Sequence, residues 1–201
     1  KIVDGEYWRL FTPMFLHIGF YHLLTNSIGI VIFGKLVETY FGTRNFVAIY
    51  LAAGIFGNIL SYAVVTNGIG AGASGAVFGI LAAYGVFLFK NRGHAGKVDQ
   101  SSLGGIALIV GLNLLFGFSV SGVDNWAHIG GLVSGSLVAY RLSPTTLLIP
   151  SRPPGVFGGL ITDLRPVLVR TSTLRLAETI ILSCAAIVLM TWVIGNSYPG
   201  R

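Results

Sequence analysis

The chain has 201 residues, of which 53% are hydrophobic and only 10% are charged. A soluble domain usually carries about 25% charged residues, so this composition excludes an ordinary water-soluble globule, and it also excludes a disordered chain, which needs low hydrophobicity. The net charge of +6 does not indicate a nucleic-acid-binding protein, because no stretch interleaves Lys and Arg with aromatic residues. The composition is typical of a protein that lies in a lipid bilayer.

Long runs without charge predict the membrane-spanning helices, because a helix needs about 20 mostly apolar residues to cross the hydrocarbon core. Residues 10–20 contain a proline and a histidine, and we expect them to form a loop at the membrane surface. Six spans are predicted after that loop, at about residues 21–41, 45–65, 74–89, 103–118, 126–140 and 176–195. The Gly-rich turn at 66–72 and the polar residues from Lys90 onward separate the second, third and fourth spans.

The segment 142–173 holds five of the seven prolines, and we expect it to be a linker. The chain therefore divides into a core over 1–141, a linker over 142–173 and an additional C-terminal transmembrane helix within 174–201.

The basic residues divide unequally between the two ends of the predicted helices. One end receives Lys35, Arg44, Lys90, Arg92, Lys97, Arg141, Arg152, Arg165, Arg170 and Arg175, and the other receives only Lys1, Arg9 and Arg201. The positive-inside rule predicts that the first set faces the cytoplasm, so both chain ends face outward. No cleavable signal peptide is evident after Lys1, and we expect further residues upstream of it.

Polar residues inside a bilayer are costly and are therefore candidates for function. His22 and Asn26 lie four positions apart and share one face of a helix. Their side chains could form an interhelical hydrogen bond that only stabilises the bundle. They could also serve a reaction at the outer end of the helix.

Ser74 opens a predicted helix directly after a Gly-rich loop, in the sequence Gly72-Ala73-Ser74-Gly75. A serine at this position is commonly an N-cap. The flanking glycines, however, leave the hydroxyl accessible, and Gly75 with Gly79 forms a small-xxx-small pair that lets another helix approach closely. The amides of the turn also point at whatever group lies above Ser74.

His128, Gly131 and Gly135 occupy positions i, i+3 and i+7 of another predicted helix, which places them on one face. A lone histidine is often structural or a metal ligand, but no Cys cluster or His-x-x-x-His pattern accompanies it, so we expect neither a metal nor a cofactor. A hydroxyl and an imidazole at hydrogen-bond distance form a nucleophile and its base. His22 and Asn26 would add donors for a developing oxyanion.

Taken together, these motifs resemble a rhomboid intramembrane serine protease over about residues 7–140. The resemblance rests on Trp8-Arg9, His22-x-x-x-Asn26, Glu38, Gly72-x-Ser74-Gly75 and Ala127-His128-x-x-Gly131-x-x-x-Gly135. It implies Ser74 as the nucleophile and His128 as its general base. It also implies an oxyanion hole formed by Asn26, His22 and the Ser74 backbone N–H.

The same resemblance implies an all-α polytopic bundle with five core helices and one extra C-terminal helix, the first core helix being absent from the sequence. Trp8 and Arg9 would lie in a loop partly within the outer leaflet, and Glu38 would be a structural hydrogen-bonding residue. The span 103–118 and the loop 119–125 would form a movable gate and cap. Phe78 stands where many members have a tyrosine that packs against the catalytic histidine.

The expected function is that of an intramembrane serine endopeptidase in a bacterial plasma membrane, acting on single-pass transmembrane proteins near the outer face. A catalytically inactive rhomboid-like protein that binds membrane clients is an alternative, although such relatives lack the serine or the histidine. A transporter is a weaker one, because no inverted repeat is visible. Asp124 could be a third catalytic residue, but we expect that Asp124 or Asn125 caps its helix. Cys184 is not expected to be a nucleophile.

Overall fold

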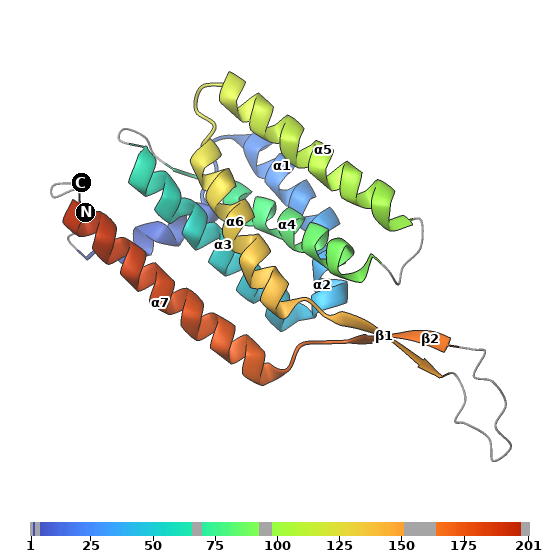
Figure 1. Cartoon of the computed structure of the whole chain (residues 1–201). Coiled ribbons are helices and arrows are strands. Elements are labelled where there is room, and N and C mark those ends of the chain that lie inside the picture. The colour runs from blue at the N-terminus through green and yellow to red at the C-terminus, as the bar shows by residue number, and fades with distance from the viewer. Residues whose placement is uncertain (1, 3–4, 66–69, 93–97, 151–163, 198–201) are drawn as a thin grey trace, which may run out of the picture.

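The computed structural model describes residues 2, 5–65, 70–92, 98–150 and 164–197. Its helices form a bundle, and two strands extend from one end of that bundle (Figure 1). The elements follow in the order η1 (Tyr7–Leu10), η2 (Thr12–Phe15), α1 (Phe20–Gly29), η3 (Ile30–Gly34), α2 (Lys35–Phe41), α3 (Thr43–Val64), α4 (Ser74–Asn91), α5 (Val98–Ser119), α6 (Asn125–Leu142), β1 (Thr145–Pro150), β2 (Leu164–Val169) and α7 (Thr173–Ser197).

The first predicted span forms one continuous helix from α1 through η3 to α2. Ile30 and Lys35, at the two junctions, both keep right-handed helical dihedral angles. η3 is a single π-helical segment, which the sequence did not predict. The expected surface loop at 10–20 contains the short helix η2, with Pro13 in its first turn, where the missing N–H of proline costs nothing.

The predicted all-α polytopic fold is confirmed. Within the described residues, five helices are long and apolar enough to cross a membrane, namely Phe20–Phe41, Thr43–Val64, Ser74–Asn91, Ser102–Ser119 and Thr173–Ser197. The remaining predicted span, at 126–140, forms as α6 but does not belong to that apolar set. α6 buries His128 and Ser134 and packs against α3 and α4. Protein therefore covers its polar side chains, and the helix does not need to be apolar all round.

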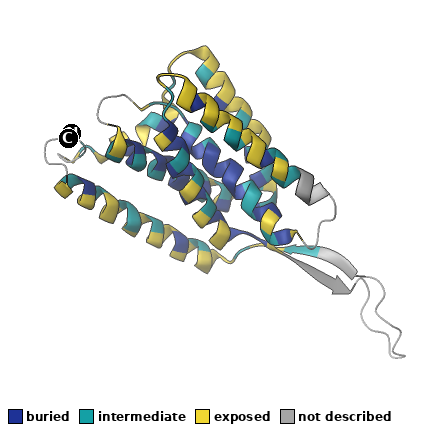
Figure 2. Ribbon diagram, turned by 45° about the horizontal axis from the view of Figure 1, so that its top comes forward, coloured by how far each residue is buried: buried dark blue, intermediate teal, exposed yellow. Residues whose placement is uncertain are grey.

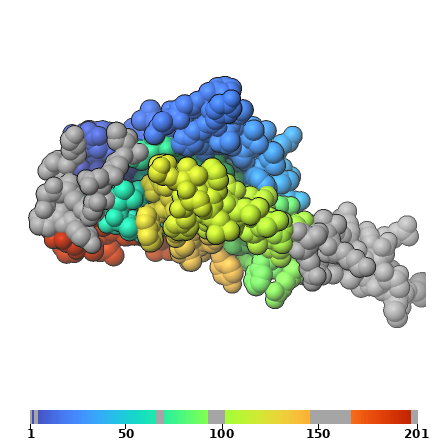
Figure 3. Space-filling view, turned by 90° about the horizontal axis from the view of Figure 1, so that it is seen from above, coloured from blue at the N-terminus to red at the C-terminus, as the bar shows by residue number. Residues whose placement is uncertain are grey.

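The core lies where α2, α3, α4 and α6 meet, and Figure 2 shows the buried residues concentrated in these central helices. The largest buried side chains include those of Phe41, Ile49, Ile80 and Leu142. α5 and α7 lie on the outside (Figure 1), and in Figure 3 α5 crosses the bundle beside the N-terminal helix. Their exposed large apolar residues suit contact with lipid tails and include Leu112, Phe116, Leu182 and Trp192.

The predicted linker contains two strands that the sequence did not reveal. β1 and β2 pair antiparallel, with Thr145 opposite Val169 and Pro150 opposite Leu164. Thr171 then ties the end of this segment back to α6, because its Oγ1 donates a hydrogen bond to the Leu142 carbonyl at 2.6 Å. Residues 151–163 of the predicted linker, and 66–69 of the predicted Gly-rich turn, lie outside the described residues. The division into three segments stays a prediction.

Candidate active site

Glycines allow α4 and α6 to touch backbone to backbone. A Cβ added at Gly131 would overlap the carbonyl oxygen of Gly75, and one added at Gly135 would overlap Gly79 one turn further along both helices. The matched order of these two contacts shows that the helices run parallel. The first turn of α4, which carries Ser74, therefore lies beside the first turn of α6.

This packing brings Ser74 and His128 together. The Ser74 Oγ lies 2.8 Å from the His128 Nε2, and His128 is only 7% exposed. The N-cap of α4 is Ala73, and no side-chain hydrogen bond caps the helix. The alternative that Ser74 is an N-cap is therefore wrong, because the helix begins at Ser74 itself and its hydroxyl is directed to the imidazole.

Asn125 holds the other side of the imidazole ring. Its Oδ1 lies 3.2 Å from the His128 Nδ1, and its Nδ2 donates to the Leu114 carbonyl of α5 at 3.0 Å. A carbonyl can only accept, so the amide nitrogen of Asn125 must face Leu114 and the amide oxygen must face His128. Nδ1 then carries the ring proton, and Nε2 is left as an acceptor for the Ser74 hydroxyl.

From the sequence, Asn125 is expected only as a possible helix cap. A Cβ at Gly117 of α5 would overlap the Oδ1 of Asn125, so the glycine makes room for this amide. Sequence proximity to His128 is the one signal that could have identified Asn125, and it does not distinguish a ring partner from a cap.

Phe78 covers one face of the imidazole. The two rings are stacked, with centroids 4.3 Å apart and planes inclined by 9°. Phe78 lies one turn after Ser74 on α4, so the helix that carries the hydroxyl also supports the ring that faces it. Ser74, Asn125 and Phe78 thus restrict the position, the tautomer and the tilt of His128.

Asp124 is the N-cap of α6, as expected. Its Oδ1 accepts from the Ala127 backbone N–H at 3.0 Å, and its Oδ2 accepts from the Ser61 hydroxyl of α3 at 2.5 Å. The carboxylate therefore fixes the first turn of α6 to α3 and sets the height of His128. These contacts give Asp124 a structural role.

His22 and Asn26 lie against the turn that leads into α4. Gly72 in that turn has a φ of +126°, and an added Cβ would stand 2.6 Å from the His22 Nε2 and 3.7 Å from the Asn26 Nδ2. The Gly72 N–H donates to the Pro13 carbonyl at 2.8 Å, which holds the turn in place. Only glycine suits this combination of backbone conformation and close approach.

Asn26 is buried, with 5% of its surface exposed. Its Nδ2 donates to the His22 carbonyl at 2.9 Å, and an amide nitrogen has a second N–H to offer. The structure therefore gathers Gly72, Ser74, His22, Asn26 and His128 at one end of the bundle.

The other residues singled out in the sequence lie apart from this group. Arg9 forms an exposed ion pair with Glu6, and Trp8 is 56% exposed on η1. Glu38 accepts a hydrogen bond from the Thr43 hydroxyl at 2.8 Å and so joins α2 to α3. It lies twelve residues beyond Asn26 on a continuous helix, which corresponds to about 18 Å.

A family model for the rhomboid domain matches residues 4–145. The chain belongs to the rhomboid family. Membership and the five apolar helices together identify it as an integral multi-pass membrane protein. The matched region contains α1 through α6, including Ser74 and His128, and ends before α7.

Several curated proteins are similar to this rhomboid chain. Rhomboid protease GluP of Bacillus subtilis (strain 168) is 45% identical over 142 residues, which are 70% of this chain and 27% of that protein. Putative rhomboid protease YdcA of the same organism is 36% identical over 140 residues, 69% of each chain. RHOMBOID-like protein 6, mitochondrial, of Arabidopsis thaliana is 39% identical over 143 residues, 71% of this chain and 46% of that protein. The chain thus matches only about a quarter of the length of GluP.

Proposed function

We propose that this rhomboid-family protein is an intramembrane serine endopeptidase with Ser74 as nucleophile and His128 as general base. The observation that supports it most directly is the 2.8 Å separation of the Ser74 Oγ and the His128 Nε2. The similarity to proteins named rhomboid proteases supports the same reaction class. A nucleophile within hydrogen-bond reach of a base that a third group orients is the usual arrangement for covalent catalysis.

The reaction would begin with attack of the Ser74 Oγ on the carbonyl carbon of the scissile peptide. His128 takes the hydroxyl proton on Nε2, which the Asn125 contact leaves unprotonated. The C–O bond forms as the carbonyl π electrons move to the oxygen and give a tetrahedral oxyanion. The imidazolium then donates its proton to the leaving amine nitrogen as the C–N bond breaks.

The oxyanion would be stabilised by groups that surround the turn before Ser74. The Ser74 backbone N–H is one of the free amides at the start of α4, and the positive end of the helix dipole points the same way. Asn26 offers its second Nδ2 hydrogen, and His22 lies over Gly72 next to it. Such donors act mainly on the charge that develops in the transition state.

Release of the acyl group requires water at a site that lies inside a membrane protein. His128 would take a proton from that water as the water oxygen attacks the ester carbon. The His128 imidazolium would then return the proton to the Ser74 oxygen as the ester C–O bond breaks. The polar residues all lie at the ends of their helices, so water from the aqueous phase can reach them without crossing the apolar core. The charge distribution predicts that this end faces outward.

The proposed substrates are single-pass transmembrane proteins whose helices unwind easily near the outer membrane face. A peptide in an α-helix keeps its carbonyl hydrogen-bonded and sterically shielded, and the bilayer offers no substitute for those bonds. Cleavage therefore favours segments that can leave the helix close to water. The bilayer itself is the other expected partner.

The test compares Ser74→Ala, His128→Ala and the matched control Ser134→Ala in the purified full chain, reconstituted with a model transmembrane substrate. Ser134 is also a buried serine in this bundle, but its hydroxyl donates to the Gly130 carbonyl at 2.7 Å within α6. Ser74→Ala should abolish cleavage, His128→Ala should nearly abolish it, and Ser134→Ala should cleave at about the wild-type rate. Cleavage by the Ser74→Ala protein would refute the nucleophile assignment. Binding of the substrate without cleavage by the unmutated protein would favour the client-binding alternative.

A further inference from the structure

A cavity lies at the end of the bundle away from Ser74. It has a volume of about 350 Å³, within the size range of small-ligand sites. It is lined by Phe41, Gly42, Thr43, Arg44, Asn45, Arg170, Thr171, Ser172, Thr173 and Leu176. Thr43 begins α3, and Ser61 near the other end of α3 contacts Asp124 beside the catalytic group. Thr43 and Ser61 are eighteen positions apart on α3, so the cavity and the Ser74–His128 site are about 27 Å apart.

The charge of this cavity is positive. Arg44 and Arg170 line it, and its lining in the described part of the chain contains no aspartate or glutamate. The Glu38 carboxylate accepts a hydrogen bond from the Thr43 hydroxyl at 2.8 Å, but Glu38 is not among the residues that line the cavity. Two arginines that face a common space repel each other, and an anion between them would remove that repulsion.

Arg170 is held in a defined orientation. Its Nη2 donates to the Thr39 carbonyl at 2.9 Å, and its guanidinium packs on Gly42, where an added Cβ would stand 3.4 Å from Nη1. Gly42 has a φ of +85°, so a side chain there would also strain the backbone. The fork of Arg170 is thus already positioned before any ligand binds, which lowers the entropic cost of binding.

Two helix N-termini add to the positive potential. α3 starts at Thr43 and α7 starts at Thr173, and both residues line the cavity. The first amides of a helix have no carbonyl partner within it, and each N-terminus carries a partial positive charge. The Thr171 hydroxyl already donates to the Leu142 carbonyl. The Ser172 oxygen accepts from the Arg175 N–H, and its own O–H remains to be donated. An oxyanion with several acceptor oxygens fits this set of donors.

We infer that this cavity binds the phosphate group of an anionic phospholipid. Phosphate matches the planar fork of arginine and the amides of a helix start. The apolar residues Phe41 and Leu176 also line the cavity. Phe41 is buried in the core, and the half-buried Leu176 offers contact to the apolar part of a lipid. Basic pockets between transmembrane helices on the cytoplasmic side suit anionic headgroups.

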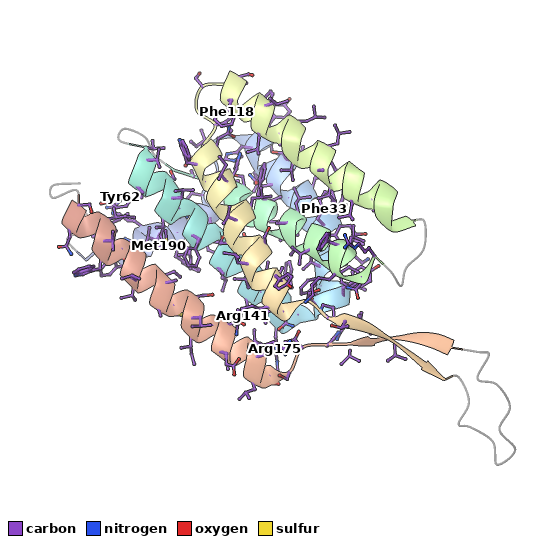
Figure 4. The ribbon with its side chains drawn as sticks, viewed as in Figure 1. Phe33, Tyr62, Phe118, Arg141, Arg175 and Met190 are labelled. Carbon is purple, nitrogen blue, oxygen red and sulfur yellow. The ribbon has the colours of Figure 1, made fainter. Side chains whose placement is uncertain are left out.

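Further basic residues surround this end of the bundle. Figure 4 shows Arg141 at the end of α6 and Arg175 at the start of α7, near the point where the strands leave the helices. Arg141 pairs with Glu178 at 3.6 Å. A lipid phosphate in the cavity would hold α7 against the corner between α2 and α3, and it would add to the link that Arg141 makes.

The test measures thermal unfolding of the purified full chain in a zwitterionic detergent and does not depend on proteolysis. The probes are short-chain phosphatidylglycerol, short-chain phosphatidylcholine and inorganic phosphate, each titrated to obtain an apparent Kd. The variants are Arg44→Gln and Arg170→Lys. The matched control is Arg92→Gln, because Arg92 lies at the same end of the bundle but over the ring of Phe89, 4.4 Å from its centroid.

Phosphatidylglycerol should raise the melting temperature in a saturable way, and phosphatidylcholine should not. Arg44→Gln should weaken phosphatidylglycerol binding by about tenfold or more, because loss of one charge-assisted hydrogen bond usually weakens binding by that factor. Arg170→Lys, which keeps the charge but loses the fork, should weaken it less, and Arg92→Gln should change it by no more than about twofold.

Equal effects of Arg44→Gln and Arg92→Gln, or none from either, would overturn the inference, because the lipid would then respond only to general surface charge. Inorganic phosphate that binds as tightly as phosphatidylglycerol would overturn the lipid assignment and indicate a site for free phosphate. Arg44 is exposed in the first turn of α3, so its replacement should not lower the melting temperature without ligand, which serves as the check on folding.

Discussion

Replacement of Asn125 by alanine should slow peptide cleavage while leaving the bundle folded. The change removes the acceptor that holds the His128 Nδ1 proton at 3.2 Å, and it removes the donor to the Leu114 carbonyl at 3.0 Å. His128 can then adopt the other tautomer, in which Nε2 carries the proton and cannot accept the one from Ser74. Only the fraction of molecules with the correct tautomer would react.

The magnitude follows from the strength of one neutral hydrogen bond, about 0.5–1.5 kcal/mol net. This free energy corresponds to a fall in kcat of roughly 2-fold to 13-fold. The loss should remain far below the ~10⁴-fold seen when a triad aspartate that orients a histidine becomes an amide. Ser74 still offers its hydroxyl to Nε2, and Phe78 still stacks on the ring.

A second variant disturbs the contact between Asn125 and His128 without replacing Asn125. In Gly117→Ala the new Cβ would overlap the Oδ1 of Asn125, whereas in Gly111→Ala it would meet nothing within 4 Å. Both glycines lie in α5, and both substitutions raise helix propensity by about 1 kcal/mol. Gly117→Ala should therefore lower kcat, and Gly111→Ala should not.

The assay is kcat for cleavage of a reconstituted transmembrane substrate, with the melting temperature recorded for each variant. Equal kcat values for Gly117→Ala and Gly111→Ala would refute this reasoning. So would an Asn125→Ala protein that melts earlier but cleaves at the wild-type rate, because Asn125 would then serve only to attach α6 to α5.

Three further predictions concern packing, the oxyanion hole and topology. Gly131→Ala should lower the free energy of unfolding by about 1–3 kcal/mol, because the new Cβ meets the backbone of Gly75 rather than a side chain that can move; an unchanged thermal unfolding curve would contradict it. Asn26→Ala should lower kcat by about 10²-fold or less and keep fluorophosphonate labelling, and a less stable variant with wild-type kcat would remove Asn26 from the site. A single cysteine at position 92 on a Cys184→Ser background should resist an impermeant maleimide in intact cells, so its modification would overturn the predicted orientation.

Elements with a local signal could be predicted from the sequence. The first span was predicted at 21–41, and the structure has a continuous helix at Phe20–Phe41. The spaced glycines of α4 and α6 indicated their close contact, because a helix face without side chains lets another helix backbone approach closely. This contact brings Ser74 and His128 together, although their catalytic roles stay a proposal.

Features that depend on distant residues could not be predicted. β1 and β2 pair although thirteen residues separate them in the sequence. Pro150 in β1 and Pro166 in β2 favoured a linker, because proline is uncommon inside strands. Asn125 resembles an N-cap until the position of the Leu114 carbonyl on α5 is known. Arg44 and Arg170 are 126 positions apart in the sequence. They reach one cavity because the segment between β2 and α7 bonds to α2 through Arg170 and to α6 through Thr171.

Identification of the residue modified by a fluorophosphonate tests the central proposal most directly. The full chain in lipid would be treated with the reagent, and the adduct would be located by peptide mass spectrometry. We expect one phosphonylated residue, Ser74, and strongly reduced labelling in His128→Ala, because a serine without its base is a weak nucleophile at neutral pH. An unlabelled Ser74 in a protein that cleaves its substrate, or an adduct on another serine whose replacement stops cleavage, would contradict it.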